Sequence, residues 1–345
     1  MSVRLLIAIL LSVSTLASAE IKQSIQLDLL NTLALGGSQD LYLASGLGQL
    51  NFQSVGNENV RAYLNLDADF TDRFDITVDR AFVKTRYQQL RLTVGKTRLS
   101  WGEGQAFNAG DVIMGGSDLN LDLTVSEYRS DSKWLLSMVH STGRFSFLEL
   151  VVIPPEPSSD PDIDPTLDRA EAAVRTRFQL AGLANTNVEL GYAQQGRQQQ
   201  PYVSLQGGKG INWHFSANLQ PHNQANFSSG LYGIAKLGEQ STVNYRTEVL
   251  YKTSGASEAQ ASGEYKTYGY LEMGLTRGSN KSYFSRNILS PIDMSALYLL
   301  GVNVNLHQGL NFYGHLSLQQ GGPDDTFSRY ISGAQSITLG CRFIF

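Results

Sequence analysis

Basic side chains gather in one stretch of the sequence, from Val78 to Gly116. Its six bases are Arg80, Lys84, Arg86, Arg91, Lys96 and Arg98. Bases that line one wall of a pore can select among ions without a cofactor, because together they set a local electrostatic field. Acidic residues come just before them, among them Asp67 and Asp69. We predict that all of these charged residues line a pore; a solvated face of a soluble sheet is the alternative.

A long glycine-rich segment follows the bases. Glycines permit sharp turns, Asn and Asp can close Asx turns, and an acid such as Glu103 can be brought opposite the bases. We predict an inward-folded loop that narrows the pore, and an ordinary surface loop is the alternative. Trp101 is expected at a membrane interface rather than as a binding platform. The predicted constriction residues are Trp101, Gly102, Glu103, Gly104, Asn108 and Asp111.

The elements that position these residues have the period-two pattern of β-strands. Near the bases, Leu90, Leu92 and Val94 alternate with polar residues, and the same alternation recurs from Ile21 to the end of the chain. The polar partners are mostly Asn, Gln, Ser, Thr, Tyr and His rather than Lys or Glu. Such partners suit a water-filled interior.

The beginning of the chain has the pattern of a secretory signal peptide. A base at Arg4 precedes an apolar core, and small residues end at Ala19. We expect residues 1–19 to be removed and residues 20–345 to form one domain. No later apolar run is long enough to cross a bilayer as a helix, which leaves a soluble exported protein or a closed outer-membrane barrel.

Composition excludes several other classes of protein. The net charge of −4 argues against a nucleic-acid partner. The single cysteine, Cys341, allows neither an intramolecular disulfide nor a multi-cysteine zinc site. The histidines have no metal-ligand spacing, so no metal and no cofactor are expected.

Two other motifs carry residues that could do chemistry. Between Pro154 and Glu171 the acids follow the spacing of a calcium loop, but Pro165 stands where glycine is needed, so a stiff hydrated surface loop is the default. His140 is followed by Ser141 and Thr142 in a segment that faintly resembles the histidine-containing segment of outer-membrane phospholipase A. No acid or amide partner can be assigned to it, and we expect no enzyme.

The last ten residues, SITLGCRFIF, alternate up to an aromatic carboxyl terminus at Phe345. This run resembles the terminal strand that Gram-negative outer-membrane barrels present to their assembly machinery. Counting alternating runs gives an all-β, transmembrane antiparallel β-barrel of about 16 strands, with a range of about 14 to 18.

The stretch from Val78 to Pro155 resembles a broad group of porin-like proteobacterial outer-membrane proteins. The shared motif positions are Arg80, Gly95, Lys96, Trp101, Gly102, Gly104, Asn108 and Asp111, while Ala109 departs from the proline of many relatives. The resemblance implies a pore-like barrel in the outer membrane and no particular substrate.

We therefore expect a passive, water-filled channel for small hydrophilic solutes, with a preference for anionic or polar ones. Outer-membrane lipid, the barrel-assembly machinery and the solute are the expected partners; the oligomeric state stays open. A plugged barrel that binds a partner at the cell surface is the second reading, and a lipid-active enzyme the third.

Overall fold

The computed structural model describes residues 21–36, 40–54, 59–71, 73–119, 121–129, 131–155, 170–180, 185–196, 198–220, 224–253, 266–307, 309–328 and 334–345. These residues form eighteen strands. The strands are β1 (Ile21–Leu35), β2 (Leu41–Ser54), β3 (Val60–Asp69), β4 (Asp75–Tyr87), β5 (Leu90–Thr97), β6 (Lys133–Ser141), β7 (Phe147–Ile153), β8 (Glu171–Gln179), β9 (Asn187–Gln195), β10 (Gln198–Lys209), β11 (Ile211–Gln220), β12 (Gln224–Lys236), β13 (Ser241–Lys252), β14 (Lys266–Arg277), β15 (Lys281–Ser290), β16 (Ser295–His307), β17 (Leu310–Gln320) and β18 (Gln335–Ile344). Among the same residues no helix is long and apolar enough to cross a membrane.

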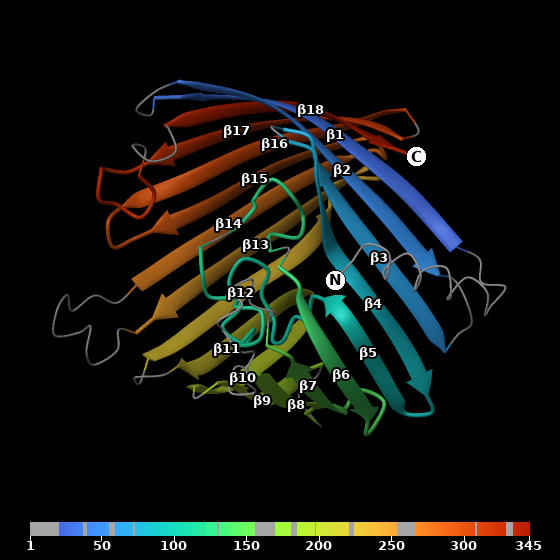
Figure 1. Cartoon of the computed structure of the whole chain (residues 1–345). Helices are drawn as coiled ribbons and strands as arrows, with labels where there is room; N and C mark the ends of the chain where they lie inside the picture. Colours follow the sequence, from blue (N-terminus) through green and yellow to red (C-terminus); the bar gives the residue numbers. More distant parts are fainter. Residues whose placement is uncertain are drawn as a thin grey trace, which may run out of the picture.

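Each strand pairs antiparallel with its neighbours in the sequence, and β1 also pairs with β18, so the sheet closes on itself (Figure 1). The final residue belongs to this seam, because the Phe345 amide donates to the Ile25 carbonyl at 2.8 Å. A closed sheet leaves no unpaired edge. The all-β barrel predicted from the alternation is thus confirmed.

The strand number exceeds the best estimate of about 16. The described residues form eighteen strands, and a count of alternating ten-residue runs misses the shortest of them. Gly210 alone separates β10 from β11, and β7 is only 7 residues long. A strand as short as β7 is easily missed in a count of ten-residue runs.

Exposed apolar side chains cover the outward face of the barrel, and most inward side chains are polar, the reverse of a soluble core. On β11, Ile211 and Leu219 are 53% and 55% exposed, whereas His214 and Ser216, on the other face, are 2% and 0% exposed. Successive side chains on a strand alternate between the two faces of the sheet. The barrel therefore has an apolar outer surface and a largely hydrophilic lumen.

A local irregularity lies where β3, β4 and β5 meet. The β3–β4 register shifts between Asn65 and Leu66, so that Asp79 is an extra residue on β4. On β5, Gly95 has a φ of +131°, and a Cβ there would clash with the Ala81 carbonyl oxygen. Only glycine fits this position. β5 ends two residues further on, at Thr97.

Candidate functional site in the barrel lumen

The segment between β5 and β6, residues 98–132, runs inside the barrel (Figure 1). We call it the inward loop. Its described residues pack against the inner wall from β7 to β16 in two buried apolar clusters. Polar side chains of the same wall bind the loop backbone, as the following contacts show. The role of the loop as a constriction stays a prediction.

The principal anchor is Glu248 on β13, which is 1% exposed. Its Oε2 accepts the backbone N–H groups of Ala106 at 2.9 Å and Phe107 at 2.7 Å, and its Oε1 accepts that of Gln105 at 2.9 Å. The Arg246 Nη1 donates to the same Oε1 at 2.8 Å. One buried carboxylate thus holds three consecutive residues of the loop, with its charge balanced by Arg246.

A second anchor lies on β9. The Glu189 Oε1 accepts the Gly102 amide at 2.7 Å, the Tyr202 hydroxyl at 2.9 Å and the Arg175 Nη1 at 3.1 Å. Trp101 is fully buried here. Its ring centre lies 5.6 Å from the ring centre of Tyr202 and 5.1 Å from the guanidinium carbon of Arg175. The expectation of an interfacial Trp101 is therefore wrong, because the tryptophan fastens the loop to the lumen wall.

The second half of the loop is held by β14 and β15. Arg286 donates through Nη1 to the carbonyl of Leu123 at 2.5 Å and to that of Val125 at 2.6 Å. Tyr128 donates its hydroxyl to Glu272 Oε2 at 3.0 Å. Carboxylates thus hold the first half of the loop by its backbone N–H groups, and a guanidinium holds the second half by its backbone carbonyls.

Inside the loop, Asn108 and Asp111 close turns as predicted for such residues. The Asn108 Nδ2 donates to the Trp101 carbonyl at 2.8 Å, and its Oδ1 accepts the Gly110 amide at 3.0 Å. The Asp111 Oδ1 accepts the Met114 amide at 3.2 Å. Burial raises the pKa of Asp111 from 3.8 to about 6, although the Met114 amide acts in the opposite direction.

Gly104 and Glu103 lie at the tip that follows Trp101. Gly104 has a φ of +128°, and a Cβ there would clash with the Phe107 carbonyl oxygen, so the turn requires glycine. Burial raises the pKa of Glu103, and the nearby Arg177 partly opposes that rise. The bases whose charges act on Glu103 are Arg177 on β8 and Arg246 on β13.

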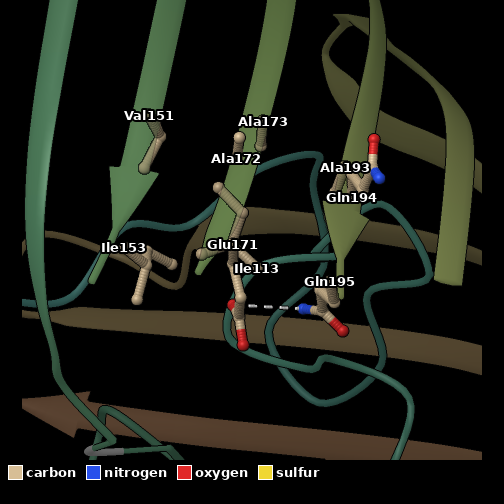
Figure 2. A pocket seen from close by; sticks show the side chains of 9 residues that line it. All are labelled: Ile113, Val151, Ile153, Glu171, Ala172, Ala173, Ala193, Gln194 and Gln195. Atoms are coloured by element: carbon tan, nitrogen blue, oxygen red, sulfur yellow. Dashed lines mark hydrogen bonds between the residues drawn. The ribbon is translucent and has the colours of Figure 1, made fainter. Parts of the chain in front are cut away.

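Ile113 packs into an apolar socket, a small pocket on the inner wall of the barrel (Figure 2). Val151 on β7 and Ala173 on β8 line this socket, and the side chains of Glu171 and Gln195 close its rim with a hydrogen bond of 3.4 Å. Ile113 itself is 2% exposed. The socket fixes the middle of the loop by packing rather than by charge, and it was invisible in the sequence because its residues come from four separate segments.

Most of the predicted basic residues share the inward face of the opposite wall. Register places Lys84 opposite Thr93 and Arg86 opposite Arg91, whereas the outward positions of the same strands carry apolar residues such as Val94. Lys96 pairs with Trp134 on the outward face, and its Nζ donates to the Val78 carbonyl at 2.6 Å. The inward set is Arg80, Lys84, Arg86 and Arg91, and Arg61, which is not among the predicted pore-lining residues, joins it.

The acids meet these bases at the edge of the loop. Glu127 of the loop accepts from Arg80 Nη2 at 2.9 Å and lies 4.0 Å from Arg98 Nε. Its side chain is 54% exposed, so the pair faces water. Asp67 and Asp69 are on the inward register of β3, near the end from which the loop enters. No spacing in the sequence had pointed to Glu127.

His140 and the acidic segment that begins at Pro154 are the two remaining motifs of the sequence. His140 pairs with Leu90 and Leu148 on the outward face of β6, whereas the next residue, Ser141, faces inward, so the two do not form a catalytic pair. Among the described residues no group of three or more His, Cys, Asp or Glu side chains could hold a metal ion. Most of the acidic calcium-like segment, residues 156–169, lies outside the described residues.

Comparison with solved structures places this architecture among known barrels. The outer membrane protein OpdK from Pseudomonas aeruginosa aligns with a TM-score of 0.59 at 9% identity, covering 94% of this chain and 98% of OpdK. OccK2 from the same organism, crystallised with glucuronate, gives 0.59 at 10% identity over 94% of this chain and 98% of OccK2. OprD from P. aeruginosa gives 0.55 at 12% identity over 95% and 97%. No protein-family model and no curated protein matches the sequence. The chain therefore shares the closed-barrel fold of these proteins.

Proposed function

We propose that the protein is an outer-membrane channel for passive diffusion of small hydrophilic solutes, with a preference for anions. Its outward strand positions carry exposed apolar residues, as acyl chains require. The period-two pattern reaches a terminal Phe345 that completes the seam, which supports recognition by the assembly machinery. Residues 1–19 are proposed as the export signal, and sequencing of the amino terminus of the mature protein tests that cleavage.

One asymmetry carries the proposal. The inward loop covers the wall from β7 to β16, where inward side chains such as Ser216, Glu248 and Tyr270 are buried. On the wall of β3 to β5 the inward bases Arg61 and Lys84 stay exposed. A passage along β3–β5 would therefore be wet, with the inward bases Arg61 and Lys84 toward one end of these strands and Asp67 and Asp69 toward the other. Bases on a pore wall favour anions over cations.

The comparisons support this function without specifying a solute. OpdK is described as an outer membrane protein, and OccK2 was crystallised with glucuronate, a hydrophilic anion. Both span nearly the whole of this chain at low sequence identity, so they support the barrel and its setting. The bases along β3–β5 support the anion preference independently of them.

Planar bilayers test the proposal with a matched pair of variants on β5. Arg91→Gln removes an inward base, and Lys96→Gln removes an outward one. Under a salt gradient, R91Q is expected to shift the reversal potential toward cations and K96Q to leave it unchanged. If R91Q leaves the reversal potential unmoved, or if K96Q moves it as far, the placement of the passage is wrong.

The packed loop favours a second candidate, a plugged barrel that binds a partner at the cell surface. Its support is the buried anchoring of the loop through Glu248 and Glu189. A plugged barrel gives no steady conductance step in a planar bilayer, whereas the proposed channel gives steps of constant size. The same recording therefore separates the two candidates.

A further inference from the structure

The two ends of the barrel differ in the length of their connections. The four connections longer than ten residues all lie at one end, at residues 98–132, 154–170, 253–265 and 321–334, whereas short turns join the strands at the other end. Outer-membrane barrels have short turns on the periplasmic side and longer loops on the extracellular side. In the proposed membrane setting, the end with the short turns therefore faces the periplasm. We define the periplasmic rim as the exposed charged residues in these turns and in the last four strand residues at that end.

Bases outnumber acids on the periplasmic rim by ten to one among the described residues. The acid is Glu239, in the turn between β12 and β13. The undescribed residues beside β1 and β3 add only Glu20 and Glu58 to the sequence. The chain as a whole has a net charge of −4, so its overall composition does not explain the excess of bases at this end.

Six of the ten bases surround the mouth of the lumen. The register of their strands places them on the inward face. None of the six forms an ion pair with a described residue. The six are Lys22, Arg61, Lys84, Arg86, Arg91 and Lys236.

Four of these inward bases form two pairs of like charge. Arg61 lies directly opposite Lys84 across β3 and β4, and Arg86 lies directly opposite Arg91 across β4 and β5. Like charges in such positions destabilise a sheet. Carboxylates brought between them would offset that cost, and a guanidinium group binds a carboxylate through two parallel hydrogen bonds. The mouth therefore suits a partner that carries several carboxylates.

Lipid of the inner leaflet does not account for the inward bases. Lipid phosphates lie outside the barrel wall, where the outward rim bases Lys209, Arg277 and Lys281 can reach them. The tenth base, Arg144, is in the turn between β6 and β7. The inward bases face the aqueous mouth, and the turns beside them are short enough for a soluble partner to approach the strand ends.

We infer that the periplasmic rim docks the acidic surface of a soluble periplasmic protein, whose Asp and Glu carboxylates bind the bases around the mouth. The inference rests on the proposed function for the membrane setting of the barrel. It goes beyond transport, because it gives the barrel a macromolecular partner. Complementary charge steers such a partner to the rim and fixes its orientation there.

Fluorescence anisotropy with a labelled decaglutamate peptide tests the docking surface on the detergent-solubilised protein. The double variant Arg86→Gln, Arg91→Gln is expected to weaken peptide binding at least fivefold, because it removes two attractive charges. Lysine at both positions keeps the charge and should keep most of the binding. The matched control is Arg73→Gln, Lys266→Gln, which removes two exposed bases at the extracellular end and should bind as the wild type does.

A band shift on heating in a detergent gel verifies that each variant barrel is folded. If the folded R86Q, R91Q variant binds decaglutamate as tightly as the wild type does, or if the wild type does not bind it, the inference is wrong. Equal weakening in the R73Q, K266Q control would also contradict it, since the peptide would then respond to charge anywhere on the barrel.

Two further comparisons distinguish the protein partner from lipid and the docking surface from the channel. In nanodiscs at physiological salt, decaglutamate should bind in phosphatidylglycerol as it does in phosphatidylcholine, because lipid phosphates do not reach the inward bases. Loss of binding in phosphatidylglycerol assigns the rim to the membrane and overturns the inference. Steady conductance steps in potassium chloride without decaglutamate binding overturn the docking surface alone. Decaglutamate binding that depends on Arg86 and Arg91, in a protein without conductance, overturns the channel alone.

Discussion

Glu248→Gln is the perturbation that probes the inward loop most directly. The carboxylate accepts three loop N–H groups, and charge-assisted bonds of this kind contribute about 1.5–3 kcal/mol each. A glutamine can keep one oxygen at Ala106 and Phe107 but turns an NH₂ group toward Gln105, which loses that bond and weakens the other two. We expect the packed loop to lose about 4 kcal/mol, which corresponds to a factor of about 10³ in the population of the detached loop.

Single-channel recording in a planar bilayer measures that population. E248Q is expected to show frequent transitions to a state of higher conductance, because a detached loop opens the lumen beside β7–β16. Glu239→Gln, in the turn that joins β12 to β13, is the control and should behave as the wild type does. A band shift on heating in a detergent gel verifies that the variant barrels are folded. If folded E248Q gives traces identical to those of E239Q, Glu248 does not hold the loop.

Three other predictions concern the same loop and the barrel seam. Burial raises the pKa of Asp111 to about 6, so the packed loop is fully stabilised below about pH 4 and loses about 3 kcal/mol as the pH rises through about 6; loop-opening events should be more frequent at about pH 7.5 than at about pH 5, and Asp111→Asn should remove that difference. Trp101→Ala deletes a fully buried ring, which costs about 3–5 kcal/mol, and should increase protease cleavage within residues 98–132 of the folded barrel, whereas an unchanged cleavage rate would contradict the anchoring role. Deletion of Phe345 removes both hydrogen bonds to Ile25 and should lower the yield of heat-modifiable barrel in cells, an effect that Phe345→Tyr should not reproduce.

The strand faces could be predicted from the sequence, because a period of two survives even where the polar partners differ. On β11 and β17 every outward position was assigned from alternation alone, and the observed exposure of Leu219 and Leu318 agrees with it. The strand number was less accessible, since a strand as short as β7 falls below the ten-residue runs on which the count rests. Local periodicity thus shows which face of a strand is apolar, but it does not show how many strands there are.

The anchors of the loop could not be predicted. Glu189, Glu248 and Glu272 occupy inward positions on three strands, and in the sequence they look like any other polar residue of a lumen. Their partners are backbone N–H groups and a tyrosine hydroxyl far away along the chain, which leave no spacing signal. Trp101 was misplaced for a related reason, because an aromatic residue at a strand end is as typical of a membrane interface as of a packed loop.

Accessibility of adjacent positions on β5 tests the central claim, that water passes between the inward loop and the wall of β3–β5. Thr93 faces inward and Val94 outward, so Thr93→Cys and Val94→Cys differ only in face. In a background with Cys341→Ser, a charged thiol reagent added to the aqueous bath should reduce the single-channel current of T93C in one step and leave that of V94C unchanged. A current that falls in V94C, or persists undiminished in T93C after its modification, would contradict the account.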